Sequence, residues 1–211
     1  TLGEKEGAFA VTFETCALPN LGYEITRYLG HVSDVTFVTN TVNVAMELSQ
    51  RQDIKLFVTG GYLSSGWFSL VGESAIQSIK TMFFDKVFIG LNGIDAEHGL
   101  TSHFVDEAAV VRAMIQQATK KIVVADYSKI GVTTRYKICD TDQIDMLITD
   151  NRATPEQVEA FEAAMDAVGL EHDLHRRLVR GRRQDEGELL AADPADVVDP
   201  AQLFLQAPCH H

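Results

Sequence analysis

The chain has few of the residues that would cross-link it or carry it into a membrane. Its 211 residues include three cysteines, five prolines and one tryptophan. The three cysteines are widely spaced and form neither a disulfide framework nor a metal-ligand pattern, which favours a reducing cytoplasm. No segment approaches the roughly 18 apolar residues of a membrane span. The first residues, TLGEKEGAF, lack the basic and apolar regions of a signal peptide.

Basic residues are also scarce. Eighteen Lys and Arg against 30 Asp and Glu give a formal net charge of -12. A duplex-binding surface needs clustered Lys and Arg to meet the phosphates, so the balance of charge argues against direct DNA binding by this chain. Apolar residues, in contrast, are plentiful at 45%, as expected for a globular domain with a proper core.

Short apolar runs alternate with helical patterns over the first 150 residues or so. The runs are nearly continuous in β-branched and aromatic residues, which is typical of strands buried on both faces. They predict strands at 8–13, 35–39, 54–59, 86–89, 122–125 and 146–149. Between them, apolar residues at helical spacing predict helices at 21–29, 42–48, 73–79 and 107–118. This alternation indicates an α/β domain with a mostly parallel sheet.

A fifth helix is predicted at 154–168. Thr154 suits the N-cap, Pro155 the first helical position, and Gln157 completes a capping box. The composition then changes: residues 172–211 hold an arginine cluster and four of the seven histidines. We therefore expect one domain over 1–171, followed over 172–211 by a peripheral helix and a tail whose composition is typical of disorder.

Ligands of a doubly wound sheet bind beyond the carboxyl ends of its strands, so the polar residues there are the candidates for a binding site. Small polar residues (39–41) follow the second strand, and a glycine pair (60–61) follows the third. The alternatives to a binding role are helix capping for the polar residues and an ordinary turn for the glycines. The fourth strand leads into a loop rich in glycine, which we expect to be flexible and able to wrap a hydroxylated ligand. Asp126 and Lys129 follow the fifth strand, where they could bind a sugar hydroxyl and a phosphate or pair with each other.

Catalytic signatures are missing from these loops. The sequence contains no GxSxG, HExxH, Walker A or CxxC motif. No nucleophile stands beside a base, and no third ligand accompanies His98 and His103. We expect no cofactor, no metal and no catalytic residue.

The loops, in this order, resemble the effector-binding domain of the DeoR family of bacterial transcription regulators. The resemblance covers about residues 6 to 170 and rests on VTNTVNVAMEL (38–48), TGGYLSSGWFSLVGESA (59–75), DKVFIGLNGIDAEHGLTS (85–102), AVVRAMIQQA (109–118), VVADYSKIG (123–131) and IDMLITD (144–150). It implies a Rossmann-like fold with helices on both faces, related to ribose-5-phosphate isomerase and glucosamine-6-phosphate deaminase. It further implies a non-catalytic sensor of a phosphorylated sugar or related metabolite that forms a homo-oligomer. The effector-binding residues it implies are Asn40, Gly60, Gly61, Gly90, Asn92, Gly93, Thr101, Asp126 and Lys129.

Two departures from the family pattern qualify that expectation. The family's helix-turn-helix would precede Thr1, so DNA is expected as a partner only through a part that this chain does not include. The family's phosphate-binding loop after the first strand is replaced by Glu14-Thr15-Cys16-Ala17-Leu18-Pro19-Asn20-Leu21-Gly22, in which Pro19 removes an amide donor. Two alternatives to a sensor therefore stay open: a sugar-phosphate isomerase or deaminase, and an oligomerisation module whose pocket has decayed.

Overall fold

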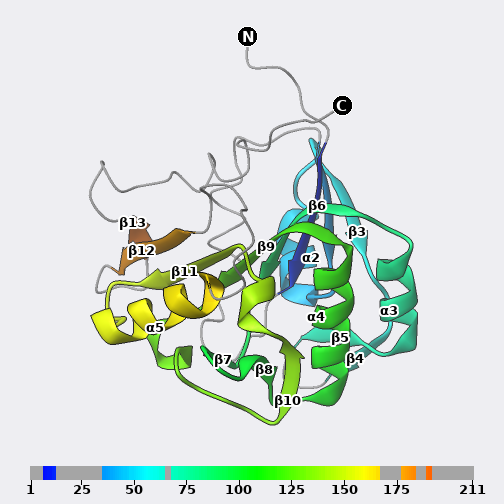
Figure 1. Ribbon diagram of the computed structural model, residues 1–211. Helices are drawn as coiled ribbons and strands as arrows, with labels where there is room; N and C mark the ends of the chain where they lie inside the picture. The colour runs from blue at the N-terminus through cyan, green and yellow to red at the C-terminus, as the bar shows by residue number, and fades with distance from the viewer. Residues whose placement is uncertain (1–6, 13–34, 65–67, 167–176, 184–188, 192–211) are drawn as a thin grey trace.

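An eight-stranded sheet organises the described part of the chain (Figure 1). The computed structural model describes residues 7–12, 35–64, 68–166, 177–183 and 189–191. Across the sheet the strands are ordered β13 (Leu189–Ala191), β12 (Arg177–Arg183), β11 (Met146–Asp150), β9 (Ala118–Val124), β6 (Phe84–Ile89), β1 (Gly7–Thr12), β2 (Val35–Thr39) and β3 (Lys55–Val58). Neighbouring strands are parallel except for β12 and β13. The predicted mostly parallel sheet is confirmed, with all six predicted strands in it.

Helices cover both faces of this sheet. They are α2 (Val42–Leu48), α3 (Glu73–Lys80), α4 (Val105–Gln117) and α5 (Pro155–Asp166). Buried side chains of α3, α4 and α5 share one apolar cluster with strand residues, and those of α2 share a second cluster. The two clusters therefore lie on opposite faces of the sheet, and Figure 1 shows α2 behind the sheet and α4 and α5 in front of it. The helix predicted at 21–29 lies outside the described residues.

The predicted start of α5 is confirmed in detail. The backbone N–H of Thr154 donates to Gln157 Oε1 at 3.0 Å, and the backbone N–H of Gln157 donates to Thr154 Oγ1 at 3.3 Å. These reciprocal bonds form a capping box, which satisfies two amides that have no partner within the helix. None of the described helices is long and apolar enough to cross a membrane.

The glycine-rich loop after β6 is more ordered than predicted. Much of it forms β7 (Gly93–Asp95) and β8 (Gly99–Ser102), which pair with β10 (Tyr136–Cys139) in a three-stranded antiparallel sheet. The expectation of a flexible loop is therefore wrong for these residues, because their backbone groups are paired across strands. A smaller hairpin, β4 (Tyr62–Ser64) and β5 (Ser69–Val71), follows β3.

The segment after residue 172 also differs from expectation where it is described. Residues 177–183, predicted to lie in a peripheral helix or tail, form β12 parallel to β11, and β13 pairs with it. Backbone pairing with β11 satisfies the hydrogen-bonding groups of an otherwise open sheet edge and does not require an apolar sequence. The rest of the predicted tail lies outside the described residues.

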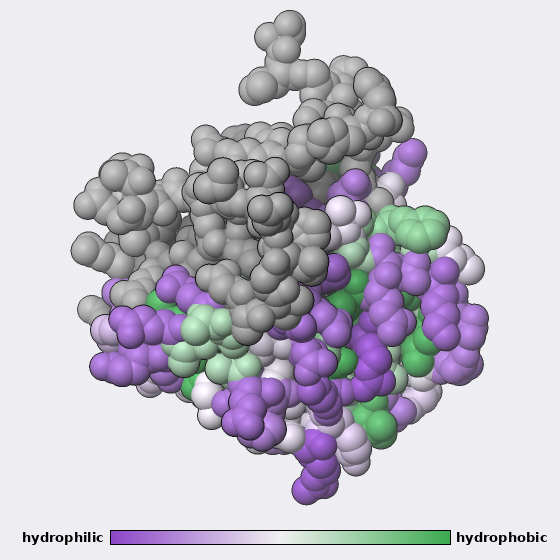
Figure 2. Space-filling view, viewed as in Figure 1, coloured by the Kyte–Doolittle hydropathy of each residue, from purple (hydrophilic) through white to green (hydrophobic). Residues whose placement is uncertain are grey.

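The order of the strands defines where a ligand would bind. The chain runs from β1 to β2 and β3 on one side, then crosses to β6 on the other side of β1. The order therefore reverses at β1, and ligands of such sheets bind at the carboxyl ends of the strands beside this switch point. In Figure 1 the β7–β8–β10 sheet lies at that end of β6. Figure 2 has the same view as Figure 1 and shows that the described surface facing the viewer is mostly hydrophilic.

Candidate functional site

The loop after β6 contains a buried amide that is only partly satisfied. Asn92 is 3% exposed. Its Oδ1 accepts hydrogen bonds from Ser102 Oγ at 3.2 Å and from the backbone N–H of His103 at 2.9 Å. Its Nδ2 is buried and has no hydrogen-bond partner among the described residues. An unpaired buried donor costs about 1–3 kcal/mol, so this amide is the kind of group that a bound ligand would satisfy.

The turn after β9 contains the second pair of predicted residues. Asp126 caps the 3-10 helix η2 (Tyr127–Lys129) by accepting the backbone N–H of Ser128 at 2.9 Å, and it also accepts the Ser128 hydroxyl. The ion pairs of the described residues do not join Asp126 to Lys129. The alternative of a salt bridge within this turn is therefore not what the structure shows. Among the described residues, the ammonium group of Lys129 has no ionic partner.

These two loops lie against each other. The backbone N–H of Gly131 donates to the carbonyl of Ile94 at 2.8 Å, and Ile94 and Ile130 form an isolated parallel bridge. The turn that carries Lys129 is thus held beside the segment that follows Asn92. Because Gly90 lies between β6 and Asn92, it belongs to the same edge, where it is buried. We call residues 90–92 and 126–131 together the β6–β9 edge.

A carboxylate–guanidinium pair supports this edge, and the sequence analysis did not identify it. Asp150 is 3% exposed at the end of β11. It accepts two bonds from the Arg152 guanidinium, at 3.2 and 3.0 Å, and one from the Tyr127 backbone N–H at 3.4 Å. The guanidinium carbon of Arg152 lies 4.2 Å from the centre of the Tyr127 ring. The signal in the sequence was an Asp directly after a buried strand, followed two residues later by an Arg.

Burial alone would raise the pKa of Asp150. The hydrogen bonds from Arg152 and its positive charge outweigh that effect, so the pKa of Asp150 is lowered from its ordinary value. The carboxylate therefore stays charged and keeps Arg152 and the Tyr127 amide in place.

Two further predicted residues, Gly93 and Thr101, belong to the antiparallel sheet behind the edge. Thr101 Oγ1 donates to the carbonyl of Gly93 at 3.2 Å and accepts from the backbone N–H of Thr134 at 2.9 Å. A Cβ atom at Gly93 would lie 2.4 Å from the carbonyl oxygen of Val132. The observed contacts of both residues are therefore with the protein itself, where they hold residues 132–134 against β7 and β8.

The remaining predicted residues follow β2 and β3, on the other side of β1. Asn40 Nδ2 donates to the carbonyl of Leu70 at 3.3 Å, so this buried amide is tied to β5. Gly60 and Gly61 have φ values of 71° and 108°, and a Cβ at Gly61 would lie 2.4 Å from the carbonyl oxygen of Val71. Glycine is required at Gly61 by both its conformation and this close approach. The loop after β1, including Glu14 and Pro19, lies outside the described residues.

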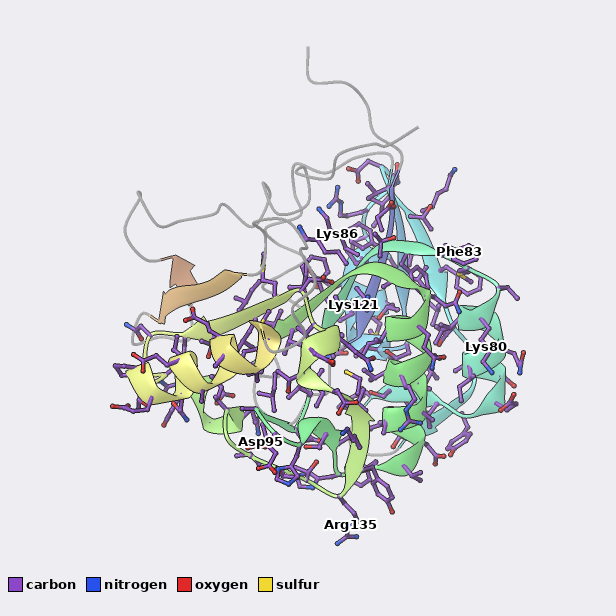
Figure 3. All side chains as sticks on the ribbon, in the orientation of Figure 1. Lys80, Phe83, Lys86, Asp95, Lys121 and Arg135 are labelled. Atoms are coloured by element: carbon purple, nitrogen blue, oxygen red, sulfur yellow. The ribbon has the colours of Figure 1, made fainter. Side chains whose placement is uncertain are left out.

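Two other polar residues, Lys86 and Asp95, lie outside the β6–β9 edge. Lys86 is 1% exposed but lies in the first half of β6, and Figure 3 shows it at the opposite end of the molecule from Asp95. Asp95 accepts the backbone N–H groups of Glu97 and His98 and contacts the His98 ring. Among the described residues, no three His, Cys, Asp or Glu side chains are grouped so that they could hold a metal ion.

An open parallel sheet with polar loops at the carboxyl ends of its strands is the architecture of an α/β ligand-binding domain. A sequence model described as the DeoR C terminal sensor domain matches residues 22–151. The chain therefore belongs to the family of DeoR C-terminal sensor domains. The resemblance stated from the sequence is confirmed.

The curated relatives carry the names of transcriptional regulators. The HTH-type transcriptional repressor GlcR of Bacillus subtilis is 39% identical over 138 residues, which cover 65% of this chain and 52% of that protein. The HTH-type transcriptional regulator GlpR of Haloferax volcanii is 33% identical over 141 residues, covering 67% and 55%. A protein of Escherichia coli O157:H7, provisionally named for repression of the aga operon, is 37% identical over 142 residues, covering 67% and 53%. All three names describe transcriptional regulators or repressors.

The chain spans about half the length of the curated relatives it matches. Similarity to solved structures is more remote. A D-ribose-5-phosphate isomerase in complex with phospho-erythronic acid has a TM-score of 0.36 and 15% identity, covering 59% of this chain and 47% of that one. A likeness at that level does not bear on what this chain binds.

Proposed function

We propose that this chain is the effector-sensing and oligomerisation domain of a DeoR-type transcriptional repressor of sugar metabolism. Its effector would be a phosphorylated sugar or related metabolite bound at the carboxyl ends of the strands. One observation carries the proposal: the unpartnered Nδ2 of Asn92 lies in a loop that is joined to the turn bearing Lys129. A buried donor and an unpaired cation at one sheet edge suit a ligand with both hydroxyl and phosphate groups.

The roles follow from the chemistry of each group. Lys129 supplies a positive charge for a phosphate, and Asn92 supplies a donor for a hydroxyl or phosphate oxygen. Asp126 holds the turn through Ser128 and keeps carboxylate capacity for a sugar hydroxyl. The exposed backbone at Gly60 and Gly61 and the buried amide of Asn40 would meet the effector from the β2–β3 side. Gly90 lets the β6 loop leave the strand, while Gly93 and Thr101 stiffen the sheet behind it.

Regulation requires a second part of the protein. The matched relatives are about twice as long as their aligned part, and several bear names that include a helix-turn-helix type. In our proposal an N-terminal DNA-binding half precedes this domain, and the two work in the cytoplasm as a homo-oligomer. Effector binding here and operator binding there must then influence each other by the same factor, because coupling between two sites is reciprocal.

A thermal-shift screen of this chain tests the proposal directly. The panel pairs phosphorylated sugars and polyol phosphates with their unphosphorylated counterparts. A ligand at about one hundred to one thousand times its Kd stabilises the folded state by roughly 2.7–4.1 kcal/mol. For a chain of this size that is a rise in Tm of roughly 5–16 °C.

The variant Lys129→Met tests the role of the charge, because it keeps much of the side-chain length and removes the ammonium group. We expect it to leave the Tm of the free protein within about 1 °C, since a half-buried cation without an ionic partner among the described residues adds little stability. It should weaken binding of the active phosphorylated compound at least about tenfold. A flat panel would favour a decayed pocket, and turnover of ribose 5-phosphate or glucosamine 6-phosphate would favour an enzyme; either result would refute the sensor.

A further inference from the structure

Both ends of the Gln157 amide are used, and they serve different purposes. Its Oε1 accepts the backbone N–H of Thr154 at 3.0 Å, which is the capping-box bond of α5. Its Nε2 donates to the carbonyl of Ile130 at 3.0 Å and to the carbonyl of Tyr127 at 3.4 Å. The chemistry of these partners fixes the orientation of the amide, because a backbone N–H needs an acceptor and carbonyls need a donor. The cap alone was predictable from the sequence.

The two carbonyls bonded by Nε2 bracket Lys129. Tyr127 begins the one-turn 3-10 helix η2 and Ile130 is its C-cap. The bonds of this helix run from the Lys129 N–H to the Asp126 carbonyl and from the Ile130 N–H to the Tyr127 carbonyl. Such short 3-10 turns have poor hydrogen-bond geometry and little stability of their own. The position of this turn therefore depends on its external contacts.

Helix α5 is a rigid support for those contacts. Its Phe161 is 1% exposed, and Val158 and Met165 are also buried in the larger apolar cluster. Gln157 lies at the start of this anchored helix, directly before Val158. It thus connects a fixed element to the turn, in addition to the Gly131–Ile94 bond at 2.8 Å and the bond from the Tyr127 amide to Asp150 at 3.4 Å.

We infer that Gln157 is a positioning residue for the effector site. By binding the carbonyls of Tyr127 and Ile130, it holds the turn so that Lys129 keeps the place in which an anionic ligand meets it. This inference rests on the proposed function of the β6–β9 edge. It extends that function by assigning a residue outside both loops, on a helix that the ligand does not need to touch.

Three variants separate the two uses of the amide. Gln157→Glu keeps the acceptor for Thr154 and removes both donors to the turn. Thr154→Ala removes the hydroxyl half of the capping box and leaves the donors in place. Gln157→Met removes both functions without adding charge. We expect a fall in Tm of about 2–4 °C for Thr154→Ala, the usual effect of losing a cap in a chain of this size, and little change for Gln157→Glu.

Hydrogen exchange measures the turn without any ligand. The amides of Lys129, Ile130 and Gly131 each donate within this region, so their protection reports how firmly the turn is held. We expect exchange about tenfold faster at these amides in Gln157→Glu and Gln157→Met, and unchanged in Thr154→Ala. Equal protection in all four proteins would overturn the inference, whether or not the chain binds a sugar phosphate.

Ligand titration completes the test, with inorganic phosphate and glucosamine 6-phosphate as probes. We expect Gln157→Glu and Gln157→Met to bind about tenfold more weakly than the wild type and Thr154→Ala to bind equally well. The loss in Gln157→Glu should persist at about 0.5 M salt, where the added charge is screened. If the wild type binds and both Gln157 variants bind as well, the inference fails while the proposed function stands. If the wild type binds neither these probes nor any compound of the thermal-shift panel, the proposed function fails, and hydrogen exchange still decides the role of Gln157.

Discussion

Two glycines with the same backbone conformation should respond very differently to substitution by alanine. Gly99 and Gly131 both have φ of 81°. A Cβ at Gly99 would lie 2.1 Å from the carbonyl oxygen of Cys139 and 3.0 Å from Cα of Asp140, whereas a Cβ at Gly131 would have no atom within 4 Å. The pair therefore separates the cost of a left-handed conformation from the cost of a steric clash.

The expected magnitudes follow from those two terms. A left-handed conformation costs an alanine roughly 1–2 kcal/mol, and Gly131→Ala pays only this. In Gly99→Ala the new Cβ, on β8, would also overlap the backbone of β10. Forcing extra volume into a packed site costs about 1–3 kcal/mol more. For a chain of this size we expect a fall in Tm of about 2–8 °C for Gly131→Ala and a further fall of about 2–12 °C for Gly99→Ala.

Thermal and urea unfolding, followed by far-UV circular dichroism, measure the difference. The antiparallel sheet supports the β6–β9 edge, so Gly99→Ala should also weaken effector binding. Equal destabilisation by the two substitutions would refute the reasoning, because it would mean that β8 and β10 move apart without cost and that the close approach at Gly99 carries no constraint.

Three further predictions concern stability, pH and thiol reactivity. Asp150→Asn should destabilise the chain by about 1–3 kcal/mol at pH 7. Folding lowers the pKa of Asp150. The difference in unfolding free energy is therefore fully present above the unfolded pKa of about 3.9 and is lost as pH falls through the folded value. Urea unfolding at several pH values would show this dependence. Tyr62→Phe removes a 2.6 Å bond between two exposed groups, Tyr62 and Asp106, so the urea midpoint should change little; a clear fall in the midpoint would mean that the bond does more than join exposed groups. Burial raises the pKa of Cys139 to about 12, so its peptide should escape alkylation at pH 8 until urea unfolds the chain, and labelling of the native protein would contradict this.

Six strands of the main sheet were predictable because each contains a nearly continuous apolar run, whereas the arginine-rich β12 has none and was not predicted. Residues 35–39 and 146–149 read as buried strands since both faces of the sheet are covered by helices. The start of α5 was predictable because a capping box is a local pattern of two residues three apart. Such features depend only on residues close together in the sequence, so the sequence alone is enough to predict them.

The antiparallel sheet could not be predicted in the same way. Its strands are short and include glycines and hydroxyl side chains. Although β7 and β8 are neighbours in the chain, the sheet is completed only by β10, which lies far along the sequence. The same dependence separates Thr101 from Asn92. Both are buried polar residues near glycines, but the hydroxyl of Thr101 bonds the backbone of Gly93 and Thr134, while the Nδ2 of Asn92 has no hydrogen-bond partner in the part of the chain that the structure describes. Which polar atom lacks a partner is decided by distant backbone groups.

The central position of β1 has a consequence for the order in which the chain folds. β1 is the first of the described strands, yet one of its neighbours, β6, is made much later: Phe9 pairs with Lys86. During synthesis, β1 must therefore wait with one edge unpaired until the chain has been extended through β6. Long-range parallel pairing of this kind is slow and leaves unpaired edges prone to aggregation. Truncations that end before β6 should accordingly accumulate as insoluble protein, whereas truncations within residues 192–211 leave every described strand pair intact.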